Sequence, residues 1–117
     1  MRTAAAKDPK VTGSVTMARF FRVLGDPTRL RIIEILSEGE CSAGQLVAAV
    51  GGLQPRVSAH LACLRHCGFV ESERRGRQVV YRLTFDGLDG LLSDADGVAA
   101  AAAARLASCT RIGPDWT

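Results

Sequence analysis

The chain has 117 residues, of which 47% are hydrophobic, 23% are charged and only 5% are aromatic. These values are typical of one folded domain with an aliphatic core, and they exclude a disordered polymer. The formal net charge of +3 is too small, taken as a total, to indicate a partner. No apolar run approaches the roughly 20 residues of a membrane span. The opening residues lack the apolar segment of a signal peptide, so we expect a cytoplasmic protein without membrane contact.

The positive charge is concentrated in the middle of the chain. Residues 56–82 contain six arginines and two glutamates, a net charge of +4, whereas residues 83–117 have a net charge of −3. Such a concentration is typical of a surface that binds nucleic acid. A solvent-exposed, arginine-rich hairpin would give the same pattern, so charge alone leaves both interpretations open.

The N-terminal third predicts a tail and two helices. Residues 1–14 are polar and aperiodic, which favours a flexible tail. From Thr16 the apolar residues recur at one helical face, namely at Met17, Phe20, Phe21 and Leu24. Asp26 and Pro27 then indicate a helix start, because Asp caps free N–H groups and Pro needs no hydrogen bond in the first turn. This second helix is expected to run to about Ser37.

The next segment predicts a helix-turn-helix. Ser42 and Gln45 have the spacing of a capping box, which predicts a short third helix through Val50. Glycines at 51–52 predict a turn, and a fourth helix is expected over residues 55–67. Two short helices joined by a glycine-containing turn are the elements of a helix-turn-helix.

The C-terminal half predicts a hairpin followed by a helix. Residues 69–83 are expected to form a β-hairpin with a basic turn at 74–77, because apolar residues alternate at Val79, Tyr81 and Leu83. Residues 86–108 are rich in alanine and predict a helix whose small side chains allow close approach of another helix. Residues 109–117 are expected to form an irregular tail.

This order of elements closely resembles the winged-helix repressors of the ArsR/SmtB family. Three segments carry the resemblance: LGDPTRLRIIEIL (24–36), GQLVAAVGGLQPRVSAHLACLR (44–65) and GFVESERRGRQVVYRL (68–83). The resemblance implies a mainly α fold with a small β-hairpin, a dimeric winged helix-turn-helix over residues 15–108. It also implies a homodimeric transcriptional repressor that leaves its double-stranded operator DNA on binding a metal ion or metalloid. No catalytic constellation is visible, so we do not expect an enzyme.

The cysteine pattern resembles that of one group of sensors within this family. The run HLACLRHCGFV, followed by Cys109, is similar to the CmtR-type cadmium/lead sensors of that family. The similarity implies thiolate ligands at Cys63, Cys67 and Cys109, and we leave open which subunit of the dimer donates the third. Cys41 lies outside the implied set. The expected effector is Cd(II) or Pb(II), with Hg(II) and As(III) as open alternatives because all four accept sulfur.

Helical geometry supports the first two of these thiols. Cys63 and Cys67 are four residues apart and lie on a helical wheel roughly 80–120° away from the core stripe Val57, Leu61 and Leu64. Two thiols one turn apart can reach one ion. Inert thiols packed against a neighbouring helix are the alternative. His66 lies away from the thiols, and we interpret it as a surface residue.

Two groups of residues are candidates for DNA contacts. The first turns of a recognition helix meet base edges and phosphates, which here selects Gln54, Arg56, Ser58 and His60. The hairpin tip would contact the phosphate backbone through Arg74, Arg75 and Arg77. Ser58 could instead cap the helix, and His60 could instead be a metal ligand.

Two other functions remain open at this point. A disulfide between Cys63 and Cys67 would strain the end of the helix, so the chain could be a thiol-redox-sensing repressor. A winged helix that binds a protein partner instead of DNA is the third possibility, although the arginine-rich hairpin tip argues against it.

Overall fold

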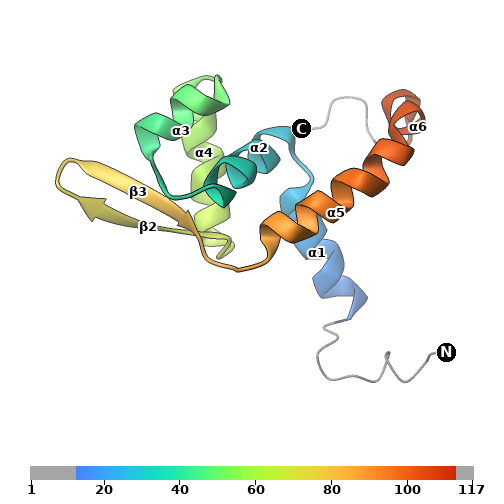
Figure 1. Ribbon diagram of the computed structural model, residues 1–117, viewed down its shortest axis with the longest axis horizontal. Coiled ribbons are helices and arrows are strands. Elements are labelled where there is room, and N and C mark those ends of the chain that lie inside the picture. Colours follow the sequence, from blue (N-terminus) through green and yellow to red (C-terminus); the bar gives the residue numbers. More distant parts are fainter. Residues whose placement is uncertain (1–12, 113–117) are drawn as a thin grey trace.

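The computed structural model describes residues 13–112 and shows a helical body from which a β-hairpin projects (Figure 1). The elements are α1 (Ser14–Leu24), α2 (Pro27–Ser37), β1 (Cys41–Ser42), α3 (Ala43–Val50), α4 (Gln54–His66), β2 (Val70–Arg75), β3 (Gln78–Leu83), α5 (Leu88–Ala101) and α6 (Ala103–Ser108). The winged helix-turn-helix fold expected from the sequence is thereby confirmed. No helix among these residues is long and apolar enough to cross a membrane.

The predicted helix starts at Asp26 and Ser42 are both present. The Oδ2 atom of Asp26 accepts a hydrogen bond from the backbone N–H of Arg29 at 3.0 Å, with Pro27 in the first turn. Ser42 and Gln45 form the reciprocal capping box, with N···O distances of 3.1 and 2.8 Å. Each cap satisfies an N–H group that the helix itself leaves without a partner.

Helix α2 lies at the centre of the body and contacts α1, α3, α4, α5 and β3. The largest fully buried side chains come from α2, α3, α4 and the start of the hairpin: Ile32, Ile33, Leu46, Leu64, Val57 and Val70. Burial of these aliphatic side chains, each contributing about 1.5–3 kcal/mol, positions the helix-turn-helix on the rest of the chain.

The turn between α3 and α4 depends on one glycine in a left-handed conformation. Gly51 has a φ of 76° and donates its N–H to the carbonyl of Val47 at 3.0 Å. A side chain would strain that conformation. Helix α4 follows after two more residues, which fixes the angle between the two helices.

The sheet has three antiparallel strands in the order β1-β3-β2. The hairpin turn is tighter than expected, because Arg75 still pairs with Gln78 and only Gly76 and Arg77 form the turn, instead of residues 74–77. Gly76 has a φ of 64°, which a two-residue hairpin turn favours. Strand β1, which the sequence did not predict, pairs with β3 through two residues.

The two ends of the chain also differ from expectation. Helix α1 begins at Ser14, within the predicted tail, and residues 1–12 lie outside the described structure, as do residues 113–117. The single helix expected over residues 86–108 is interrupted at Ala102, where α5 ends and α6 begins. A run of alanines has no apolar periodicity, so nothing in the sequence marked this break.

Candidate functional site

Helix α4 has one buried face and a flank that carries the thiols. Val57, Leu61 and Leu64 are at most 2% exposed, which confirms the predicted core stripe. Cys63 is half-buried and Cys67 is exposed, so neither thiol belongs to that stripe. His66 is exposed, in agreement with its interpretation as a surface residue.

Both thiols face helix α1. Cys63 lines a surface hollow of about 370 Å³, and Cys67 lines a second one of about 300 Å³. The two hollows share Arg19 and Val23, which lie on α1. Arg22 and Arg29 also line the hollow at Cys63, so this thiol lies beside three arginines. The predicted pair of thiols therefore lies in a groove between α1 and α4.

The thiols of Cys63 and Cys67 lie close enough for Cys63 to affect the ionisation of Cys67. Partial burial, the charge that Cys63 can acquire and a hydrogen bond between the two thiols raise the pKa of Cys67, while the charge of Arg29 lowers it. The raised pKa favours the neutral thiol of Cys67 in the metal-free protein. Two adjacent sulfurs fit a thiophilic ion, whose binding displaces their protons.

Cys109 does not complete the site within one chain. It is half-buried and directly follows α6, a helix that Figure 1 shows well away from α4. Within residues 13–112, no group of three or more Cys, His, Asp or Glu side chains is placed to hold a metal ion.

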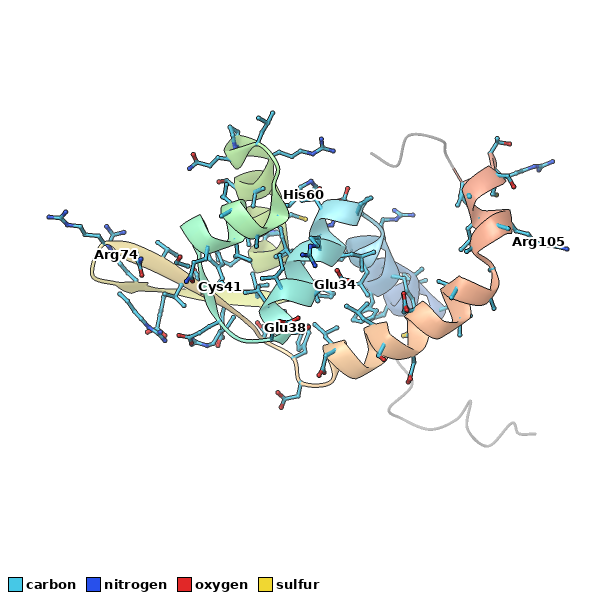
Figure 2. All side chains as sticks on the ribbon, turned by 45° about the horizontal axis from the view of Figure 1, so that its top comes forward. Glu34, Glu38, Cys41, His60, Arg74 and Arg105 are labelled. Carbon is cyan, nitrogen blue, oxygen red and sulfur yellow. The ribbon has the colours of Figure 1, made fainter. Side chains whose placement is uncertain are left out.

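His60 points toward the helical body. Its Nε2 lies 3.6 Å from Oδ2 of Asp26, its Nδ1 lies 3.5 Å from Nη1 of Arg29, and its side chain is 18% exposed. Figure 2 shows His60 between α4 and α2. The ring of His60 therefore faces α2, unlike the exposed candidates on α4, and its role as a DNA contact stays a prediction. No pattern in the sequence indicated Asp26 and Arg29 as its partners.

The other candidates on α4 are available to a partner. Gln54, Arg56 and Ser58 are all exposed, and none of them belongs to the buried stripe of the helix. No acidic residue occupies the first turn of α4. The N–H groups and the Arg56 guanidinium at this end therefore form a surface suited to a polyanion.

The arginines of the hairpin differ in whether they form ion pairs. Arg74 and Arg77 are exposed and make no ion pair with another residue of the described structure. Arg75 pairs with Glu40, which precedes β1, and with Glu73 at 2.8 Å. Figure 2 shows Arg74 at the tip of the hairpin.

Carboxylates neutralise the base of the hairpin. Arg82 donates to Glu71 and Glu73, both at 2.7 Å. Hydrogen bonds from Arg75 and Arg82 lower the pKa of Glu73, so this carboxylate stays ionised at neutral pH. The free positive charge of the hairpin is thus confined to its tip.

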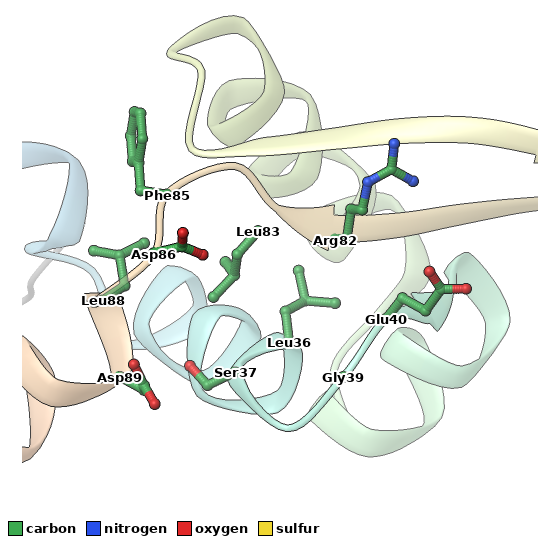
Figure 3. Close-up of a pocket in the computed structure, with 11 residues that line it drawn as sticks. Leu36, Ser37, Gly39, Glu40, Arg82, Leu83, Phe85, Asp86, Leu88 and Asp89 are labelled. Carbon is green, nitrogen blue, oxygen red and sulfur yellow. The ribbon is translucent and has the colours of Figure 1, made fainter.

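A further hollow of about 410 Å³ lies where α2, β3 and α5 meet (Figure 3). Its polar lining includes Glu40, Arg82, Asp86 and Asp89. No cysteine or histidine lines it, so it offers none of the ligands that a thiophilic ion prefers. Cys41 lies nearby on β1 and is separate from the groove of the other thiols.

Residues 26–72 match the family model described as bacterial regulatory protein, arsR family. A probable mercury resistance operon repressor of Streptomyces lividans is 39% identical over 117 aligned positions, which cover 91% of this chain and 94% of that protein. The regulator CmtR of Mycobacterium tuberculosis is 51% identical over 67 positions, 57% of each chain.

Solved structures agree with these matches. The NMR structure of the cadmium sensor CmtR superposes with a TM-score of 0.56 and 47% identity, covering 66% of this chain and 80% of that one. The homodimeric winged helix-turn-helix domain of a possible ArsR-family regulator from Mycobacterium bovis gives a TM-score of 0.62 at 27% identity, covering 81% and 85%.

Proposed function

This chain belongs to the ArsR family of bacterial regulatory proteins, and we propose that it is a metal-responsive transcriptional repressor. The metal-free homodimer binds operator DNA, and a thiophilic ion captured by cysteine thiolates weakens that binding. One observation carries the proposal: the thiols of Cys63 and Cys67 lie at the C-terminal end of the helix that begins with the exposed Gln54 and Arg56. An ion bound at one end of α4 can therefore change the orientation of the other end.

The DNA contacts come from α4 and from the hairpin. Gln54 and Arg56 have side chains that can contact base edges in the major groove, and Ser58 suits a phosphate. Arg74 and Arg77 at the hairpin tip supply phosphate contacts. Arg75 joins them when it exchanges its carboxylate partners for phosphate. His60, which faces Asp26, acts by positioning α4.

A second copy of the chain completes the proposed assembly. Helix α5 buries only Leu88 in the single chain, while its Val98 is 74% exposed. Helix α1 exposes Met17 and Phe21. Contact between two copies would cover these apolar side chains, which a monomer would leave in water. Support for the homodimer also comes from the similar Mycobacterium bovis domain, which is described as homodimeric.

The effector site consists of Cys63 and Cys67 with Cys109 as the third thiolate. Because Cys109 lies apart from the other two in one chain, the partner subunit of the dimer is its proposed source. Cd(II) and Pb(II) are the favoured effectors, on the similarity of the cysteine pattern to that of CmtR. The similarity to a mercury resistance repressor supports Hg(II), and arsenite has the same preference for sulfur.

The decisive experiment measures metal binding and DNA release together. A duplex that binds the full-length protein is selected from a random library, and its affinity is followed by fluorescence anisotropy during titration with Cd(II), Pb(II), Hg(II) or arsenite. We expect thiolate-to-metal charge-transfer bands to rise in the ultraviolet as DNA is released. Because metal binding and DNA binding are linked, the DNA must lower the metal affinity by the same factor by which the metal lowers the DNA affinity.

Single Cys-to-Ser variants assign the ligands. The variants at Cys63, Cys67 and Cys109 should each weaken the bands and the release of DNA, whereas Cys41→Ser is the matched control and should change neither. An intact spectrum in Cys109→Ser would contradict the third ligand. Unchanged DNA affinity with all four ions would contradict metal sensing.

The proximity of the two thiols supports one alternative function. Cys63 and Cys67 could form a disulfide with a peroxide as oxidant, in which two thiols lose two protons and two electrons and the peroxide is reduced to water. The strained helix end would then release DNA. Counting free thiols after mild peroxide treatment separates this function from metal sensing: loss of two thiols together with loss of DNA binding would support it.

A further inference from the structure

The side chain of Arg29 connects three helices. Its Nε donates to the carbonyl of Val23 at 2.6 Å and its Nη2 donates to the carbonyl of Arg22 at 3.2 Å, both at the end of α1. Its Nη1 lies 3.5 Å from Nδ1 of His60 on α4. The backbone N–H of Arg29 is itself held by Asp26. One residue of α2 therefore ties the end of α1 to the N-terminal half of α4.

The same guanidinium faces the thiols. Arg29 lines the hollow that contains Cys63, and its positive charge acts on Cys67. Arg29 is half-buried, so solvent screens its charge less than that of a surface arginine. Its contact with His60 is at the limit of hydrogen-bond distance and is the weakest of its three side-chain contacts.

Ligation changes the charge beside Arg29, provided that the proposed metal-dependent function is correct. Cysteines lose their protons when they bind an ion. Three thiolates around one divalent ion leave a single net negative charge beside the guanidinium. That charge attracts the guanidinium of Arg29. The contact of Arg29 with His60 is its weakest, so this contact breaks first.

We propose that Arg29 is the positioning residue that couples cysteine ligation to the DNA-binding end of α4. In the metal-free protein it links His60 to the end of α1. When Cys63 and Cys67 bind an ion, the guanidinium turns toward the thiolates and leaves His60. The N-terminal half of α4 then loses its link to α1. Its DNA-contacting side chains are no longer aligned with the DNA groups that they bind.

The test is the coupling ratio, which is the dissociation constant for the selected duplex with saturating Cd(II) divided by that without it. In Arg29→Met we expect this ratio to fall by about 2- to 30-fold, the range that such coupling residues show. The charge-transfer bands of the full-length dimer should remain. A merely structural role would weaken DNA binding equally in both states and leave the ratio unchanged.

Two further variants make the test specific. Arg22→Met removes a positive charge from the same hollow but keeps the carbonyl that Arg29 binds, so its ratio should match that of the wild type. His60→Ala removes the other end of the link without altering the hollow, so its ratio should fall. The histidine variant carries the test if Arg29→Met does not fold.

An unchanged ratio in a folded Arg29→Met or in His60→Ala would overturn the coupling role. An equal fall of the ratio in Arg22→Met would also overturn it, because charge alone would then explain the effect. A wild-type ratio of one would instead refute the proposed metal response itself, so the two failures are distinguishable.

Discussion

His60 and Asp26, which are 34 positions apart in the chain, meet where α4 crosses the start of α2, with Nε2 of the histidine 3.6 Å from Oδ2 of the aspartate. That oxygen also accepts the N–H of Arg29 at 3.0 Å, and Asp26 is only 6% exposed. One carboxylate thus caps α2 and lies beside a side chain of the recognition helix. Loss of this carboxylate should therefore affect both elements.

Asp26→Ala is expected to destabilise the protein by about 1–2 kcal/mol, because the first turn of α2 loses its cap. Asp26→Asn is the matched variant, because it can keep the cap while removing the charge beside His60. It should therefore lower the free energy of unfolding by less than Asp26→Ala does. Urea unfolding at one fixed protein concentration measures both, since the stability of a dimer depends on concentration. Equal stability of wild type and Asp26→Ala would contradict the capping role.

Helix α4 offers the opposite case, a helix start without a side-chain cap. Leu53 occupies the capping position and is 76% exposed. Leu53→Ser should stabilise the protein by about 1 kcal/mol, because the hydroxyl can accept a free N–H of the first turn. Leu53→Ala removes the same apolar surface without adding an acceptor and should give no such gain in urea unfolding. A gain of equal size in both variants would contradict the explanation.

The elements with local signals were predictable from the sequence. The caps at Asp26 and Ser42 and the glycine turn at Gly51 depend on contacts within a few residues, so their sequence patterns were sufficient. Strand β1 consists of two residues that pair with distant β3, and no local pattern marks it. The break at Ala102 lies in an alanine run in which every position is alike.

The candidate site was predictable only in part, for a related reason. The helical wheel placed Cys63 and Cys67 away from the core stripe because their angles depend on α4 alone. What faces that flank is a tertiary property, so Arg19 and Arg29 gave no sequence signal. The same limit applies to His60. Its angle on the helical wheel depends on α4 alone, but its partners come from α2 and the residue that caps it.

Alkylation of Cys67 should depend on pH over a range higher than that of an ordinary cysteine. Its pKa is raised, so the reactive thiolate appears only as the pH rises through that higher value. Cys63→Ala removes the neighbouring charge and the hydrogen bond, which should move the profile toward lower pH without abolishing the effect of burial. The rate of iodoacetamide labelling, measured by mass spectrometry between pH 6 and 10, tests this. An unshifted profile in the variant would count against contact between the thiols.

The last prediction concerns the pairing of Arg75 with Glu40. Because this pair ties an arginine of the hairpin to the segment before β1, Glu40→Gln should remove one of the two carboxylate partners of Arg75, leaving only Glu73, and so make its guanidinium more available to phosphate. DNA affinity should then rise, and the slope of log affinity against log salt should become steeper by about one phosphate contact. Glu38→Gln makes the same change in net charge and has no arginine partner within residues 13–112, so it controls for general electrostatics. Equal effects of both variants in salt-dependent anisotropy would mean that Glu40 acts through net charge and does not restrain Arg75.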